Sequence, residues 1–321
     1  MNIIKDKREK ISFVIPCYNS TNTIANVVEE IKNVMTGEMS GYDYEIVLVN
    51  DGSPDMTTYN AILDIVKREK YIKGINLSRN FGQPSAVMAA LNQTTGDYVV
   101  CGDDDGQTPF NELPKLFAKI KEGYDLVEAR YSTRERRSLF RKLGTIMNEG
   151  MSTWLIAKPK GLELTTYWVV RRFVVDEMIA YSNSYPYLGG LMLRVTQNVC
   201  NVDVTHRERF SGSSGYSFKK MLELWLNGFT SFSLKPLRLM SVIGIMVAII
   251  GFLYGIIIIV KRIIDQTTFA GYSSIMAVNL FMFGVLFFFL GLIGEYVGRI
   301  YMSLNRAPQF VIKDYKESEE V

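Results

Sequence analysis

A regular alternation of short apolar runs with amphipathic helix patterns, between residues 11 and 129, constrains the fold most strongly. The runs cover residues 11–15, 44–49, 72–77, 98–101 and 126–129, and helix patterns fill the intervals between them. Runs of this length that are rich in β-branched residues and bounded by polar residues are typical of buried strands. Strands that alternate with helices predict an α/β domain with a mainly parallel sheet and right-handed crossovers.

Polar clusters follow the predicted strands, at the points where the apolar runs stop. Asn19, Asp51 and Arg79 belong to the first three of these clusters. Because the carboxyl ends of parallel strands meet at one edge of a sheet, we expect these side chains to gather there. Ligands of open α/β sheets bind at that edge. The convergence therefore predicts a functional site, although each residue taken singly is more often a turn or cap residue.

Three consecutive acids, Asp103, Asp104 and Asp105, follow the run at 98–101, and Gly106-Gln107-Thr108-Pro109 comes next. Asp103 and Asp105 flank one residue, a spacing at which two carboxylates on a tight turn can share a divalent cation bound to phosphate. The alternative for the motif in isolation is a solvated acidic turn that caps the next helix. The sequence contains no glycine-rich phosphate loop of the P-loop or dinucleotide-binding type, which favours metal-assisted phosphate binding.

Composition excludes some classes of partner and compartment. The net charge of +3 is too small to indicate nucleic-acid binding. Cys17, Cys101 and Cys200 are scattered without paired spacing, so we expect free thiols in a reducing compartment. The N-terminus is charged and lacks the apolar segment of a secretory signal, which predicts a cytosolic N-terminal domain. The single histidine, His206, lies beside arginines and is assigned no role.

Apolar residues make up 48% of the chain and are concentrated after residue 238. Residues 239–260 and 275–297 are apolar spans of transmembrane length, the second interrupted only by Asn279 and Glu295. The segment 211–237 begins with a Ser/Gly-rich break and continues with aromatic residues and lysines, which predicts a helix in the membrane interface. The alternative for the two spans is a buried helical hairpin in the core of a soluble protein.

The short basic flanks of the two spans predict their orientation. Lysines and arginines precede the first span and follow the second, whereas the loop between them offers only Lys261 and Arg262. We therefore expect a multi-pass protein of the cytoplasmic (inner) membrane with the N-terminal domain and both termini in the cytosol. Gly-x3-Gly spacings that begin at Gly251 and Gly294 let helices approach closely and favour a homo-oligomer.

Seven segments resemble, in their order, the glycosyltransferases of family 2 with the glycosyltransferase A-type Rossmann-like fold. Within that family the chain is similar to the polyprenyl-phosphate glycosyltransferases, which include dolichol-phosphate mannose synthases and bacterial undecaprenyl-phosphate glucosyltransferases. The segments are Val14-Ile15-Pro16-Cys17-Tyr18-Asn19, Val49-Asn50-Asp51-Gly52-Ser53, Ser78-Arg79-Asn80-Phe81-Gly82, Asp103-Asp104-Asp105-Gly106-Gln107-Thr108-Pro109, Glu128-Ala129-Arg130-Tyr131, Arg209-Phe210-Ser211-Gly212 and Ser231-Phe232-Ser233-Leu234-Lys235-Pro236-Leu237-Arg238. Each is weak alone, but seven in order, followed by two apolar spans, are specific.

The resemblance implies inverting transfer of a single sugar from a nucleotide sugar to polyprenyl phosphate at the cytosolic face of the membrane. By family frequency the default donor is glucose on uridine diphosphate, ahead of a guanosine diphosphate sugar, and relatives suggest a tetramer. The resemblance also divides the chain into a cytosolic catalytic domain at 1–210, an interfacial segment at 211–237, a transmembrane hairpin at 238–298 and a cytosolic tail at 299–321.

The resemblance assigns roles to individual residues as well. The residues that would hold the base and ribose of the donor are Pro16, Tyr18, Asn19, Val49 and Asp51. In the family's Asp-x-Asp motif, Asp103 and Asp104 would lie near the donor. Asp105 and Gln107 would bind the metal ion, Mg²⁺ or Mn²⁺.

Two arginines, Arg130 and Arg209, match residues that in relatives approach the phosphates of donor or acceptor. With Asp103 and Asp105 they form the expected catalytic set. Departures from the family pattern fall at Ser20-Thr21, where family members usually have an acid, and at Thr166 and Gly215, where many relatives have an acid and a lysine on the expected acceptor side.

Two other functions remain open at this point. A catalytically silent membrane scaffold that binds nucleotide or lipid is the first, and the intact Asp-x-Asp and glutamine cluster argues against it. A processive polysaccharide synthase is the second, but the chain lacks a Gln-x-x-Arg-Trp segment and the longer set of spans that a pore requires.

Overall fold

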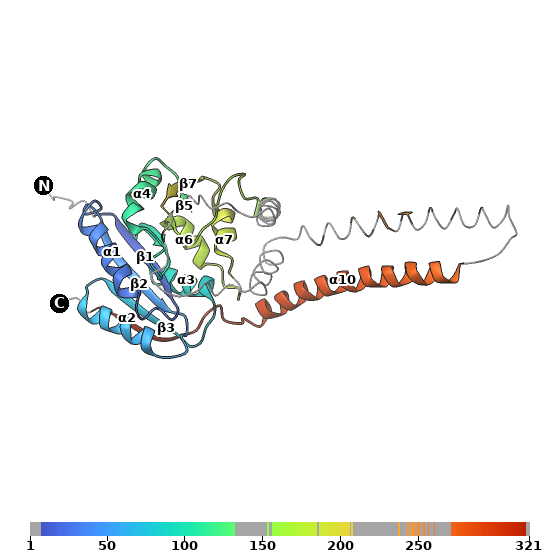
Figure 1. Ribbon diagram of the computed structural model, residues 1–321, viewed down its shortest axis with the longest axis horizontal. Coiled ribbons are helices and arrows are strands. Elements are labelled where there is room, and N and C mark those ends of the chain that lie inside the picture. The colour runs from blue at the N-terminus through green and yellow to red at the C-terminus, as the bar shows by residue number, and fades with distance from the viewer. Residues whose placement is uncertain are drawn as a thin grey trace. The chain divides into compact units, whose positions relative to one another are not determined.

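The computed structural model describes residues 8–131, 153, 156–184, 186–205, 207, 237, 271–318 and isolated positions between 242 and 260. The chain divides into two compact units (Figure 1), one formed by residues 1–217 with 306–321 and the other by residues 218–305. Each unit is described by itself below.

The first unit is built on an eight-stranded sheet with the order β7-β5-β6-β4-β1-β2-β3-β8. Its strands are β1 (Lys10–Cys17), β2 (Asp43–Asn50), β3 (Ile72–Leu77), β4 (Tyr98–Cys101), β5 (Leu126–Tyr131), β6 (Trp168–Arg171), β7 (Val199–Val204) and β8 (Ile312–Glu317). The pairs β1–β2, β1–β4, β2–β3 and β5–β7 are parallel, whereas β6 and β8 pair antiparallel with their neighbours. The predicted α/β class with a mainly parallel sheet is confirmed.

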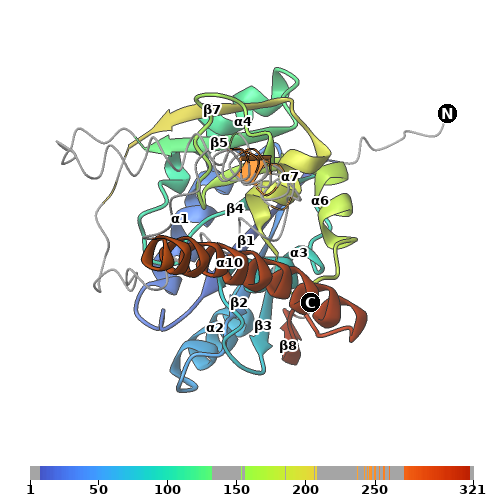
Figure 2. The same ribbon diagram turned by 90° about the vertical axis from the view of Figure 1, so that its right-hand side faces the viewer.

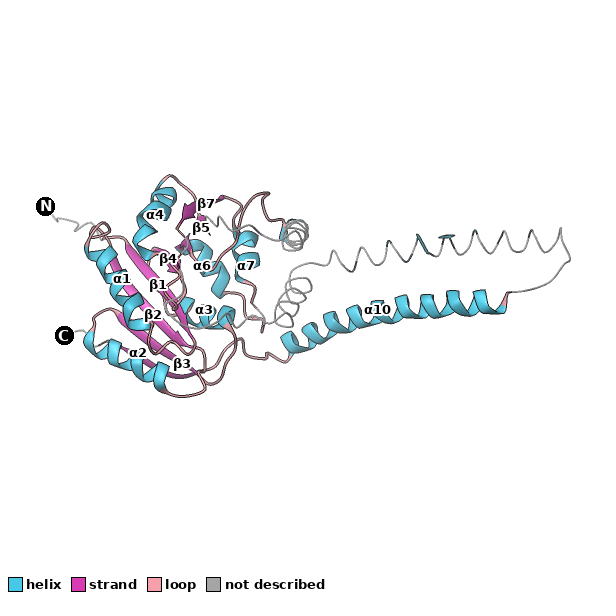
Figure 3. Cartoon of the chain, in the orientation of Figure 1, coloured by secondary structure: helices cyan, strands magenta, loops and turns pink. Residues whose placement is uncertain are grey.

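Helices cover both faces of this sheet (Figures 1 and 2). In the first unit they are α1 (Ile24–Thr36), α2 (Thr57–Arg68), α3 (Gln83–Leu91), η1 (Phe110–Glu112), α4 (Leu113–Lys121), α6 (Arg172–Ile179) and α7 (Leu188–Val195). Helices α1, α2 and α4 share one apolar cluster with alternate strand residues such as Phe13, Ile46 and Val100. Helix α3 packs on β1 and β2 from the other side, where α6 contacts β4. Figure 3 shows the strands enclosed between these helices.

A network of buried charged residues stabilises the sheet near the start of β2, at the end opposite the polar loops. Glu45 on β2 is 2% exposed. One of its oxygens accepts hydrogen bonds from Ser12 Oγ at 2.6 Å and Thr95 N at 2.6 Å. The other lies 2.9 Å from Lys10 Nζ and 3.1 Å from Lys73 Nζ. These donors outweigh the opposing effect of burial and lower the pKa of Glu45 to about 2.

Two elements differ from what the sequence pattern indicates. The pair Gly189-Gly190 locally favours a turn, but helix α7 begins at Leu188. A Cβ atom on Gly189 would lie 2.8 Å from Leu164 Cδ1, so this glycine serves close packing rather than a turn. The tail, to which no element was assigned, contributes β8, and Asp314 on it accepts a hydrogen bond from Tyr59 Oη at 2.7 Å.

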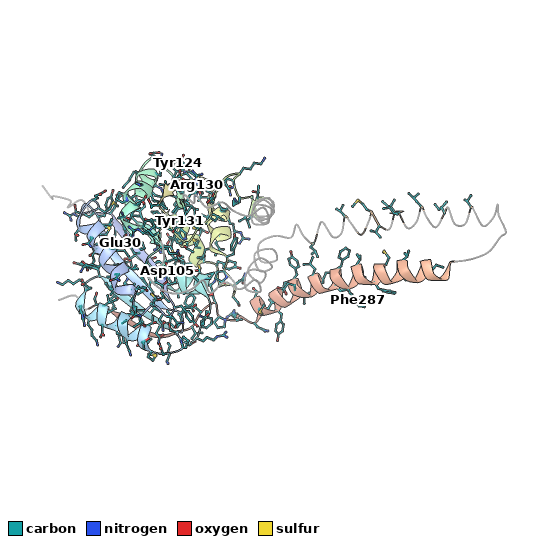
Figure 4. The ribbon with its side chains drawn as sticks, viewed as in Figure 1. Glu30, Asp105, Tyr124, Arg130, Tyr131 and Phe287 are labelled. Carbon is teal, nitrogen blue, oxygen red and sulfur yellow. The ribbon has the colours of Figure 1, made fainter. Side chains whose placement is uncertain are left out.

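The second unit contains helix α10 (Tyr272–Leu304), and its segment Met282–Leu304 is long and apolar enough to cross a membrane. Most of its described side chains are exposed, and Phe287 (Figure 4) is 69% accessible. Among the described residues this is the single helix that meets these criteria. The other predicted span, at 239–260, is described only at isolated positions, and the interfacial segment at 211–237 lies outside the described residues except for Leu237.

Candidate functional site

The loops that follow the four central strands are joined to one another by hydrogen bonds. After β1, Tyr18 N donates to Asp104 Oδ2 at 3.1 Å, and Ser20 Oγ donates to the same oxygen. Asn19, with a positive φ of 58°, donates its N–H to Ser53 Oγ in the loop after β2, at 3.1 Å. The polar clusters therefore converge on one sheet edge, as the sequence predicts.

Asp51 links the loop after β2 to the loop after β3. Its two carboxylate oxygens accept hydrogen bonds from Phe81 N at 2.8 Å and Gly82 N at 2.9 Å. Burial raises the pKa of Asp51 to about 6, although these two N–H donors act in the opposite direction. Gly52 has a φ of +59°, and a Cβ atom there would lie 2.1 Å from the Arg79 carbonyl carbon. The two loops thus touch backbone to backbone at Gly52.

Pro16 and Val49, the expected contacts of the donor base, lie directly opposite each other in the β1–β2 register and are buried. Tyr18, which follows β1, is 47% exposed. An exposed aromatic ring at the carboxyl end of a buried strand pair is suited to stacking on a flat ligand. The structure thus puts these three predicted residues on adjacent stretches of one edge.

The acidic turn after β4 is held from three directions. Asp103 N donates to Thr108 Oγ1 at 2.9 Å, which closes the turn on itself. Asp103 Oδ1 accepts from Gln83 Nε2 at 2.9 Å, and Asp103 Oδ2 accepts from Thr166 Oγ1. Burial raises the pKa of the neighbouring Asp104 carboxyl to about 6, with a further contribution from its acidic neighbours.

Asp105 and Gln107, the predicted metal ligands, lie side by side in this turn. Asp105 Oδ1 accepts a hydrogen bond from Gln107 N at 3.0 Å, while Gln107 Nε2 donates to the Arg207 carbonyl oxygen at 3.3 Å. Asp105 is labelled in Figure 4 and is partly exposed.

The oxygen atoms of Asp105 and Gln107 are suitable ligands for a divalent cation that is also bound by the substrate diphosphate. Among the described residues, no group of three or more acids, histidines or cysteines is arranged to hold a metal ion. Mg²⁺ is often bound through one or two carboxylates together with substrate phosphates, so a full protein cage is not required. Asp105 and Gln107 are both partly exposed, so the carboxylate of the first and the amide oxygen of the second can provide the protein's share of such a site.

Arg130 has a protein partner in this structure. On β5, its Nε lies 2.6 Å from Asp203 Oδ1 on β7, and its Nη2 lies 3.1 Å from Asp203 Oδ2. Arg209 lies outside the described residues, as do His206 and Gly215. The described Arg207 makes a paired contact with Glu30 on α1, with both distances 2.9 Å. The expected role of Arg130 toward phosphates stays a prediction, because in this structure its guanidinium binds the Asp203 carboxylate.

The sequence pattern did not identify three partners of the acids. Ser20 contacts Asp104, and Gln83 and Thr166 contact Asp103. Ser20 and Thr166 stand out in the sequence only as departures from the family pattern. No signal in a single sequence marks a serine or glutamine that reaches across a sheet edge.

Glu128 on β5 is a further buried acid close to these residues. It is fully buried, and its Oε2 accepts hydrogen bonds from Thr165 N at 2.9 Å and Thr165 Oγ1 at 3.3 Å. Its Oε1 has no hydrogen-bond partner among the described residues. Burial raises the pKa of Glu128 to about 8, against the hydrogen bonds from Thr165.

The raised pKa of Glu128 predicts how stability depends on pH. The folded protein keeps this proton up to about pH 8, whereas the unfolded chain releases it near pH 4.5, so stability falls as pH rises between these values. Between pH 6.5 and 8, above the pKa of Asp51 and Asp104, Glu128→Gln is expected to remove a slope of up to about 1.4 kcal/mol per pH unit. Chemical unfolding of both proteins at several pH values measures it, and parallel pH dependences would contradict the assignment.

Comparison with known proteins gives consistent matches along the whole chain. The family described as glycosyl transferase family 2 matches residues 12–182, and the family described as GtrB C-terminal hairpin matches residues 235–300. The chain is similar to the undecaprenyl-phosphate 4-deoxy-4-formamido-L-arabinose transferase of Proteus mirabilis, with 34% identity over 310 residues, 96% of this chain and 94% of that protein.

Two further similarities extend this result. The uncharacterized glycosyltransferase YkcC of Bacillus subtilis is 32% identical over 306 residues, which cover 94% of this chain and 93% of that protein. The solved structure of mannosyl-3-phosphoglycerate synthase from Rubrobacter xylanophilus superposes with a TM-score of 0.52 at 16% identity, over 70% of this chain and 73% of that one. At this identity the likeness to the solved structure is one of fold.

Proposed function

The chain belongs to glycosyl transferase family 2, and from that premise we propose that it transfers a single sugar from a nucleotide sugar to polyprenyl phosphate. The observation that carries the proposal is the set of hydrogen bonds that joins the loops after β1, β2 and β3 to one another and to the Asp103–Gln107 turn after β4. Relatives that match nearly the full length are named as transferases to undecaprenyl phosphate. A silent scaffold or a processive synthase is favoured by no observation on this chain.

Each group at this edge has a task in the proposed reaction. Pro16, Val49 and Tyr18 would hold the donor base, and Asn19 and Asp51 belong to the loops that would surround its ribose. Asp103 and Asp104 would orient the donor diphosphate and sugar. Mg²⁺ or Mn²⁺ held by Asp105 and Gln107 would neutralise the charge on the nucleoside diphosphate as it leaves.

The acceptor needs little activation from the protein. A lipid phosphate is ionised at neutral pH, so its oxygen can attack the anomeric carbon without a strong general base. Direct displacement inverts that centre, breaks its bond to the diphosphate oxygen and releases the nucleoside diphosphate. Positioning of the two substrates and stabilisation of charge would then supply most of the rate. Arg130 and Arg209 are the proposed contacts of donor or acceptor phosphates.

The proposal also specifies which sugar is transferred and which nucleotide carries it. The named relatives act on 4-deoxy-4-formamido-L-arabinose, according to their names, whereas family frequency gives glucose on uridine diphosphate. We propose a uridine diphosphate sugar and favour the formamido-arabinose donor, because these relatives share about a third of their residues with this chain along nearly all of its length.

A panel of radiolabelled uridine and guanosine diphosphate sugars tests the proposal. Membranes that contain the protein are incubated with each donor, undecaprenyl phosphate and Mg²⁺ or Mn²⁺. We expect label from one uridine donor in the organic phase, dependent on the added lipid. Transfer from a guanosine donor alone would overturn the choice of nucleotide, and transfer of glucose in preference to formamido-arabinose would overturn the choice of sugar.

The division of the chain and its topology are also proposed. Strand β8 follows α10 in sequence and pairs with β3, so residues 312–317 lie on the same side of the membrane as the catalytic sheet. The number of crossings between residues 217 and 306 is therefore even. If α10 crosses once, a second crossing must lie between residues 218 and 271, which supports the hairpin with spans at 239–260 and 275–297. We keep the cytosolic location of the catalytic domain and both termini, and a homo-oligomer, as predictions.

Cysteine labelling checks this topology. In a variant without native cysteines, Gln266→Cys in the loop between the spans is expected to react with an impermeant thiol reagent in intact spheroplasts. Lys313→Cys on the exposed face of β8 is expected to react only after the membrane is permeabilised. Equal labelling of both positions in intact spheroplasts would place them on the same side of the membrane and would contradict a crossing by α10.

A further inference from the structure

A chain of contacts links a buried acid in the sheet to the acidic turn. Glu128 on β5 and Cys101 at the end of β4 both lie opposite Trp168 of β6 in the sheet register. Glu128 Oε2 accepts from the N–H and the hydroxyl of Thr165, at 2.9 and 3.3 Å. The next residue, Thr166, donates its hydroxyl to Asp103 Oδ2.

Glu128 lowers the stability of the folded protein at this position. It is fully buried, and its Oε1 has no hydrogen-bond partner among the described residues. An unsatisfied buried polar group costs about 1–3 kcal/mol, so a side chain without a polar role would be more stable here. Burial also raises its pKa to about 8, so Glu128 is mainly protonated at neutral pH. Glu128 therefore lowers the stability of the fold but holds Thr165. Residues that lower stability in this way are often found at functional sites.

We propose that Glu128 is a positioning residue that holds the Thr165–Thr166 segment and, through the Thr166 hydroxyl, sets the orientation of the Asp103 carboxylate in the donor site. The inference rests on the proposed function, because it assumes that Asp103 meets a nucleoside diphosphate sugar. Gln83 holds the other oxygen of Asp103 at 2.9 Å, so the two contacts together fix both carboxylate oxygens. Thr166, the residue that departs from the family pattern, thereby belongs to the donor side of this chain.

Two pairs of variants separate the hydrogen bonds from side-chain size. Thr166→Val removes the hydroxyl that reaches Asp103, whereas Thr166→Ser keeps it. Glu128→Leu removes the acceptor of the Thr165 N–H, whereas Glu128→Gln keeps one acceptor oxygen and resembles the protonated acid. Glu163→Gln, on an exposed residue of the same segment, is the matched control.

The readouts are calorimetric binding of UDP in the presence of Mn²⁺ and the KM values of donor and acceptor in the transfer assay. Thr166→Val and Glu128→Leu are expected to weaken UDP binding and raise the donor KM about tenfold, as loss of an outer contact to a ligand group commonly does. The acceptor KM should stay unchanged. Thr166→Ser and Glu128→Gln should recover most of the loss, and the double variant Glu128→Leu/Thr166→Val should lose no more than either single variant.

Other results would overturn the inference. Unchanged UDP binding and donor KM in Thr166→Val would show that its hydroxyl does not position Asp103. Additive losses in the double variant would show that Glu128 does not act through Thr166. A protein that binds UDP but transfers no sugar would refute the proposed function, while the binding measurements would still decide on the Glu128–Thr166 contact.

Discussion

Replacing Asp105 with alanine is expected to lower the rate of sugar transfer by about a thousandfold, the loss that follows removal of a key charge-stabilising group. Asp105 is the acid whose partly exposed carboxylate lies beside Gln107 in the turn after β4, where a cation bound to the donor diphosphate would sit. The measurement is transfer of label to undecaprenyl phosphate at saturating donor and acceptor. An unchanged rate in Asp105→Ala would contradict the proposed role of the turn.

A matched control distinguishes lost chemistry from lost structure. Asp64→Ala changes an acid on the surface of α2 whose carboxylate, 60% exposed, lies 3.6 Å from Lys67 Nζ. It is expected to leave transfer unaltered, because exposed ion pairs contribute at most about 1 kcal/mol to stability. Asp105→Ala should unfold at the temperature of the parent protein and yet bind UDP more weakly when Mn²⁺ is present.

Glu45→Ala is expected to destabilise the catalytic unit by about 3–5 kcal/mol, because it removes one partner from a buried ion pair. Lys73 Nζ, whose side chain is 11% exposed, would lose its carboxylate at 3.1 Å. Ser12 Oγ and Thr95 N would lose their acceptor as well. For a unit of this size the change corresponds to a fall in Tm of about 10 °C, measured by thermal unfolding in detergent.

The same residue predicts an acid-dependent loss of stability. The pKa of Glu45 is about 2 in the folded protein and near 4.5 in the unfolded chain. Its contribution is therefore fully present above about pH 4.5 and is lost as pH falls toward 2. Glu45→Ala should lack this part of the acid transition. Glu69→Ala, which removes a surface partner of Lys32, should keep it, and identical acid transitions in the parent and Glu45→Ala would contradict the assignment.

Much of the central sheet could be predicted from the sequence because parallel strands covered on both faces are continuous apolar runs. The runs at 72–77 and 98–101 coincide with β3 and β4. The other runs lie within the observed strands and end one or two residues early. Some of those extra residues are polar, such as Asn50 and Arg130, and hydrophobicity alone cannot assign them.

The elements that the sequence did not reveal depend on distant partners. Strand β8 is mostly charged and at most partly buried, and it forms because β3 offers an open edge more than 200 residues earlier. Helix α7 contains the pair Gly189-Gly190, which locally favours a turn, but Leu164 packs against Gly189 and the helix persists. Tertiary contact outweighs local preference in both cases.

In the candidate site, too, features set by local sequence could be predicted, whereas contacts between distant residues could not. The edge could be located because strand ends of a parallel sheet must converge, and Asn19, Asp51 and Asp104 do take part in the contacts that join the loops. The cross-sheet partners Gln83 and Thr166 could not be found, because their spacing from Asp103 reflects the fold alone. The ion pair of Arg130 with Asp203 likewise arises from the pairing of β5 with β7.

The most direct test of the central claim is the mass of the lipid product made by the purified protein. The protein in detergent is incubated with undecaprenyl phosphate, Mn²⁺ and the uridine diphosphate sugar that the donor panel identifies. We predict a lipid with one added sugar joined through the phosphate, together with one released UDP for each sugar transferred. A polymer on the lipid, or UDP binding without any sugar-modified lipid, would contradict the account.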